Sequence, residues 1–111
     1  KHTNPCGCAV AADLPAAFAR AYDGDPQAAF GGIIALNRPV DAATAEAMVP
    51  RQFVEVVIAP DFTPEALTIL TTKPKWKANV RLLAVGAAKP IPTGARYAKN
   101  VLGGVLLQDY D

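Results

Sequence analysis

The pattern that most restricts the fold of this chain is the alternation of short apolar runs with helix signals. Residues 30–36 read FGGIIAL and residues 53–59 read FVEVVIA. Continuous apolar runs of this length, rich in β-branched residues, are typical of buried strands. Residues 79–85 predict a further strand. Strands that alternate with helices indicate βαβ units, so the sequence predicts a mainly parallel sheet covered by helices.

The segments between these runs have the start and stop signals of helices. Asp13 is a candidate N-cap for a helix that ends at Gly24, and Asp41 is one for a helix that ends before Pro50. Thr63 is the candidate N-cap of a third, shorter helix. The predicted helices are therefore short and each precedes or follows a predicted strand.

The C-terminal end carries a different pattern. After the proline- and glycine-containing stretch 89–94, two strand-like segments surround residues 102–104 and predict an antiparallel pair. The predicted class is thus α/β, with a mainly parallel sheet, helices and this pair. Because 111 residues suffice for one core, we expect residues 1–111 to form a single α/β unit. The abrupt start at Lys1, without an initiator Met, leads us to expect a piece of a longer chain.

Charge and hydropathy exclude some classes of partner. The net charge is +1, and no basic excess points to nucleic acid. The longest apolar runs fall far short of the about 20 residues that span a bilayer, so we expect no membrane segment. The chain also lacks the apolar core of a signal peptide, which favours a cytoplasmic location.

The first residues, KHTNPCGC, contain the most reactive side chains of the chain. Neighbours in a strand point to opposite faces, so Lys1 and His2 can reach one substrate only where a strand ends, and Asn4-Pro5 provides such an end. A nearby ammonium favours the neutral imidazole that a general base requires. Lys1 could stabilise an oxyanion or give a proton to a leaving group. This is chemistry suited to group transfer onto a weak nucleophile.

The two cysteines suggest a metal site less strongly. A zinc deaminase pairs H-x-E with P-C-x-x-C, whereas here no Glu follows His2 at that spacing and Cys6 and Cys8 are only two residues apart. We therefore predict no metal and expect both cysteines to be reduced and packed. Two alternatives stay open at this point: a zinc-dependent deaminase-like hydrolase, and a non-catalytic nucleotide-binding α/β module.

Gly31 and Glu55 are further candidates for contacts with a ligand. A residue without Cβ at position 31 lets the backbone approach a ring or a ribose closely, and the alternative is a strand bulge. A carboxylate inside the run FVEVVIA is costly to bury unless something pairs with it, and the alternative is a side chain that faces solvent from an edge strand. The residues alone do not decide between these readings.

Four blocks of the sequence resemble the AICAR transformylase domain family, which is part of a bifunctional purine biosynthesis protein that also has IMP cyclohydrolase activity. The blocks occur in the order of the family along nearly the whole chain. They are KHTNPCG (residues 1–7), AFGGIIA (29–35), RQFVEVVIAP (51–60) and GGVLLQD (103–109).

The resemblance implies a function and a site. The implied reaction transfers a formyl group from 10-formyltetrahydrofolate to the 5-amino group of AICAR. Lys1 and His2 match the catalytic pair of the family, and His2, Phe30, Gly31 and Glu55 match substrate-binding positions. The resemblance also implies a cytidine-deaminase-like layered fold that has lost zinc, and a homodimer. Other blocks of the family have no counterpart here, so we expect residues 1–111 to be nearly inactive alone.

Overall fold

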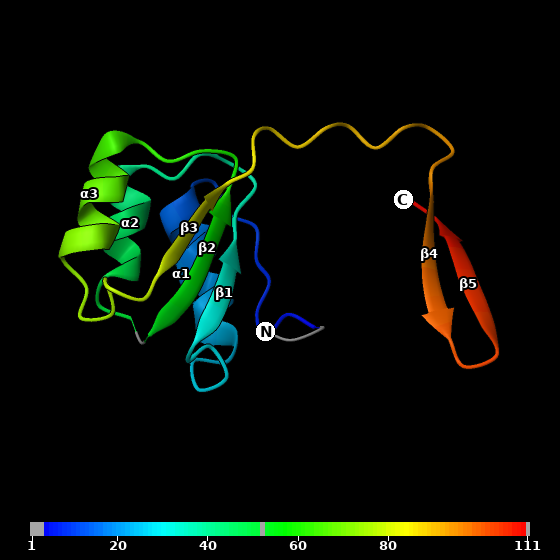
Figure 1. Ribbon diagram of the computed structural model, residues 1–111, viewed down its shortest axis with the longest axis horizontal. Coiled ribbons are helices and arrows are strands. Elements are labelled where there is room, and N and C mark those ends of the chain that lie inside the picture. The colour runs from blue at the N-terminus through cyan, green and yellow to red at the C-terminus, as the bar shows by residue number, and fades with distance from the viewer. Residues whose placement is uncertain (1–3, 52, 111) are drawn as a thin grey trace.

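The computed structural model describes residues 4–51 and 53–110. In this part of the chain a three-stranded parallel sheet with helices is followed by a two-stranded antiparallel hairpin (Figure 1). The predicted α/β class, with a mainly parallel sheet and a C-terminal antiparallel pair, is confirmed. The elements in chain order are α1 (Leu14–Gly24), β1 (Gly32–Ala35), α2 (Ala42–Met48), β2 (Val54–Ala59), α3 (Pro64–Thr72), β3 (Arg81–Ala84), β4 (Arg96–Val101) and β5 (Gly104–Asp109).

The helices begin at the side chains that the sequence predicted as N-caps. Asp13, Asp41 and Thr63 each accept a hydrogen bond from the backbone N–H three residues further on, at 2.8, 2.8 and 3.2 Å. The hydroxyl of Thr44 also donates to Asp41, at 2.6 Å. This hydroxyl, followed by the Thr44 backbone N–H, holds the pKa of Asp41 below its ordinary value, because both bonds favour the carboxylate.

The core lies between the sheet and the helices. Strands β1, β2 and β3 are adjacent in that order, and α2 and α3 are the crossovers that join them. Val57 of β2, Met48 of α2 and Leu70 of α3 are all fully buried in one cluster. Residues from successive βαβ units thus share one hydrophobic core.

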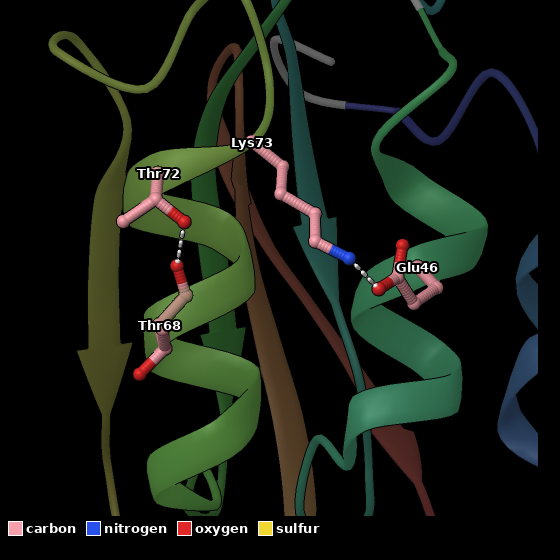
Figure 2. Close-up of polar contacts among 4 residues, drawn as sticks. All are labelled: Glu46, Thr68, Thr72 and Lys73. Atoms are coloured by element: carbon pink, nitrogen blue, oxygen red, sulfur yellow. Dashed lines mark hydrogen bonds and ion pairs between the residues drawn. The ribbon is translucent and has the colours of Figure 1, made fainter.

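An ion pair ties the two crossover helices together at the surface. Lys73, directly after α3, donates to Glu46 of α2 (Figure 2). Both side chains are about half exposed, so the pair contributes roughly 1 kcal/mol or less to stability. The packing of α2 on α3 therefore rests on the core rather than on this contact.

Two predictions about burial are wrong. Residues 30–36 were expected to form a buried strand, but Ile33 is 52% exposed, because among the described residues β1 pairs with β2 alone. Cys8 is exposed rather than packed. The ring of Trp76, in the loop after α3, is buried in the core cluster.

The hairpin of β4 and β5 stands apart from the sheet in Figure 1. These two strands contact each other and no other helix or strand of the described chain. Leu106 and Leu107 are 58% and 62% exposed, and consecutive strand residues point to opposite faces. Both faces of the hairpin are therefore apolar.

No helix in residues 4–51 and 53–110 is long and apolar enough to cross a membrane.

Candidate functional site

The two residues predicted to be catalytic, Lys1 and His2, lie outside the described residues. The chain that follows them is placed against α1. A β-carbon built on Gly7 would lie 1.8 Å from the backbone oxygen of Ala21, so the two backbones are in direct contact. Only glycine permits this approach without a shift of the chain. The last turns of α1 thus hold the segment that leads to Lys1 and His2.

Glu55 lies on an irregularity of the sheet. Gly32 pairs with Val54, and the next residue of β1, Ile33, pairs with Val56, so Glu55 is skipped in the register. This is the geometry of a β-bulge, in which one strand carries an extra residue. The bulge explains how a charged residue fits between two valines of the central strand: Glu55 is exposed and is not a ladder partner of β1 or β3.

Gly31 lies beside this bulge. Its φ of +63° is in the left-handed region that favours glycine, and its N–H donates to the carbonyl of Phe53 at 2.8 Å. A β-carbon on Gly31 would lie 3.9 Å from Oε1 of Glu55. Gly31 therefore lies next to a strand bulge, which was the alternative expectation, and its contact with a ligand stays a prediction.

Two aromatic rings extend the same surface. The ring centroids of Phe30 and Phe53 are 6.0 Å apart, with the planes tilted by 58°. Phe30 is 55% exposed, so part of its ring is open to a ligand. The structure thus brings together Phe30, Gly31 and Glu55, the three predicted substrate-binding residues that it describes.

The sequence analysis did not single out Arg51, Phe53 or Tyr22 as site residues. The guanidinium carbon of Arg51 lies 4.6 Å from the ring centroid of Tyr22, which belongs to α1. The Nε of Arg51 is buried and has no hydrogen-bond partner in residues 4–51 and 53–110. An arginine directly before the glutamate-containing run was the only signal in the sequence for this contact.

A groove lies between residues 6–10, α1 and β1. Its volume is about 370 Å³, and its lining comes from residues 6–10, α1 and β1, with Gly32 and Val54 at the bulge. Aliphatic and aromatic side chains provide most of this lining. The groove is thus a largely apolar space between the segment that follows Lys1 and His2 and the edge strand.

The cysteines line the groove without forming a bond. Cys6 and Cys8 are both free thiols. Among the described side chains, no three His, Cys, Asp or Glu residues gather in a group that could hold a metal ion. A zinc site would need His2 as a third ligand beside Cys6 and Cys8, and His2 lies outside the described residues.

Comparison with protein families gives one match that covers the whole chain. The model of the AICARFT/IMPCHase bienzyme family matches residues 1–111.

Proposed function

Because this chain belongs to the AICARFT/IMPCHase bienzyme family, we propose that it carries formyltransferase chemistry of that bifunctional enzyme. The family is consistent with purine biosynthesis, in which the formyl acceptor is AICAR and the donor is 10-formyltetrahydrofolate. The structural observation that supports this proposal most is the cluster of Phe30, Gly31 and Glu55 around the bulge of β2. Glu55 is distant in sequence from Phe30 and Gly31 but lies beside Gly31 in space.

The surface around the bulge suits a ring-bearing polar substrate. Gly31 has no side chain of its own, so a flat ring or a ribose could approach its backbone closely. The carboxylate of Glu55 can accept hydrogen bonds from amino or hydroxyl groups, and the exposed part of Phe30 offers an apolar face. In this proposal these three residues bind and orient AICAR.

The catalytic step is assigned to Lys1 and His2. The 5-amino group of AICAR is a poor nucleophile, because its lone pair is delocalised into the imidazole carboxamide. His2 accepts a proton from this amine as the bond from its nitrogen to the formyl carbon forms. Lys1 stabilises the negative charge that develops on the formyl oxygen. The bond from the formyl carbon to N10 of the folate then breaks, and N10 takes up a proton.

The proposal extends to the assembly. The complete active site is expected to include residues outside positions 1–111, and the protein is expected to act as a homodimer. The exposed apolar faces of the hairpin support this reading, since such surfaces are usually covered in a stable protein. The expected location of the enzyme is the cytoplasm.

The test is a formyl-transfer assay on the full-length protein that contains this chain. Tetrahydrofolate should appear only when both AICAR and 10-formyltetrahydrofolate are present. A chelator should leave the rate unchanged, whereas loss of activity with the chelator and its return with zinc would support the hydrolase reading. Binding of AICAR without any formyl transfer would favour the non-catalytic module.

A further inference from the structure

Arg51 connects the last turn of α1 to the start of β2. Its backbone N–H donates to the carbonyl of Met48 at 3.0 Å, which closes the end of α2. Its side chain extends to α1, where the guanidinium carbon lies 4.6 Å from the ring centroid of Tyr22. A cation at this distance from an aromatic face is attracted by the ring. The contact therefore links two elements that are far apart in sequence.

The position of the Arg51 side chain has an unfavourable free-energy contribution. Its Nε is buried and finds no hydrogen-bond partner within residues 4–51 and 53–110. A buried donor without a partner is unfavourable, and such a group in a native structure calls for an explanation. A methionine or leucine would keep most of the apolar part of the side chain without an unmet donor. The cation over Tyr22 therefore calls for a role besides packing.

The contact joins the two parts of the proposed site. On one side, α1 carries Tyr22 next to Ala21, whose backbone oxygen touches Gly7 in the segment that leads to Lys1 and His2. On the other side, Arg51 precedes Phe53 by two residues, and the carbonyl of Phe53 accepts the N–H of Gly31. A shift of α1 relative to β2 would therefore move the segment around Gly7 relative to Phe53 and Gly31.

We propose that Arg51 is a positioning residue for the formyl transfer. Through the face of Tyr22 it fixes the last turn of α1, and with it the segment around Gly7 that follows Lys1 and His2 in the sequence, relative to Gly31 and Glu55. The inference rests on the proposed function. A misplacement of reacting groups by about 1 Å can lower a rate by roughly 100-fold, so a loose contact at Arg51 should affect turnover.

The test compares variants of the full-length protein. Arg51→Met keeps an unbranched apolar stem and removes the cation, and Tyr22→Leu removes the aromatic face. Each should lower kcat by roughly tenfold, while the KM for AICAR changes by less than about twofold. The double variant should be no slower than the slower single variant, because both substitutions break the same contact.

Two conservative variants serve as matched controls. Tyr22→Phe keeps the ring, and Arg51→Lys keeps the cation, so both should retain at least about one third of the wild-type kcat. If Arg51→Met fails to fold, the kcat values of Tyr22→Leu and Arg51→Lys can still be compared with that of the wild type. The pH profile of kcat should keep its shape in all folded variants, because the base itself is unchanged.

Several outcomes would overturn the inference. A lower melting temperature with an unchanged kcat would mean that Arg51 only stabilises the fold, and additive losses in the double variant would mean that the two residues act separately. These results differ from a failure of the proposed function. If the proposed function is wrong, the wild type itself transfers no formyl group. If the wild type is active and Arg51→Met is equally active, only the role of Arg51 is rejected.

Discussion

Oε1 of Glu55 lies 3.9 Å from the position that a β-carbon would occupy on Gly31. Gly31 directly precedes β1 and Glu55 lies in β2, and the bulge in β2 displaces Glu55 from the register of the sheet. Bulges of this kind are over-represented next to active sites. The first predictions concern these two residues.

Gly31→Ala should weaken both the fold and the binding of AICAR. The φ of +63° costs an alanine roughly 1–2 kcal/mol, although 3.9 Å to the nearest side-chain atoms leaves room for the methyl group. We expect the KM for AICAR to rise about tenfold, which corresponds to roughly 1.4 kcal/mol.

The matched control for Gly31→Ala is Gly86→Ala. Gly86 has a φ of +78° and no atom within 4 Å of a built β-carbon. Urea unfolding should show a similar loss of stability in both variants, while the KM changes only in Gly31→Ala. If the KM for AICAR rises equally in Gly31→Ala and Gly86→Ala, the rise comes from the loss of stability alone.

Glu55→Gln should reduce catalytic efficiency without destabilising the protein. The side chain is exposed, so the free energy of unfolding should change by less than about 0.5 kcal/mol. Loss of a hydrogen bond to the charged group should lower kcat/KM by roughly 10- to 100-fold. Calorimetric titration with AICAR measures the binding part directly. Glu65→Gln, an exposed glutamate in the first turn of α3, is the control and should bind AICAR as the wild type does.

Gly7→Ala should displace the segment that leads to the catalytic pair. The new β-carbon would clash with the backbone oxygen of Ala21, so the segment or α1 must move. We expect a loss of about 1–3 kcal/mol in stability and a fall of roughly tenfold or more in kcat. In Gly24→Ala the nearest atom is 3.6 Å away, an ordinary contact, so this control should keep its kcat. Wild-type turnover in Gly7→Ala would show that the position of this segment is irrelevant.

Asp41→Asn should change how stability depends on pH. The hydrogen bonds from Thr44 lower the pKa of Asp41 in the folded protein, so its contribution to stability is present above the unfolded pKa of about 3.9. This contribution is lost as the pH falls below about 4 and through the folded pKa. Asparagine still caps α2 but does not titrate. Between pH 6 and pH 3, the free energy of unfolding measured with urea should therefore fall less in Asp41→Asn than in the wild type. Equal falls would contradict the assignment of this pH dependence to Asp41.

The sequence predicted the local elements well because their signals are local. Capping at Asp13, Asp41 and Thr63 depends on residues within one turn, and all three caps are present. The burial of a strand depends on its neighbours instead. Nothing in FGGIIAL states that β1 pairs with β2 alone among the strands of residues 4–51 and 53–110, and nothing near Trp76 states that its ring reaches the core.

The candidate site was predictable in part. The match to the family blocks identified Phe30, Gly31 and Glu55, and the structure places them together. The bulge that exposes Glu55 could not be predicted, because the pairing register is set by two strands and their packing. The contact of Arg51 with Tyr22 joins residues that are distant in sequence and follow no local periodicity.

The most direct test of the account is the rate of formyl transfer by His2→Ala compared with wild type. Both are measured in the full-length protein, with folding checked by circular dichroism and AICAR binding by calorimetry. If His2 is the general base, the folded variant should bind AICAR normally and transfer the formyl group roughly 100-fold or more slowly. A folded His2→Ala with the wild-type rate would contradict the role of His2 and, with it, the proposed catalytic mechanism.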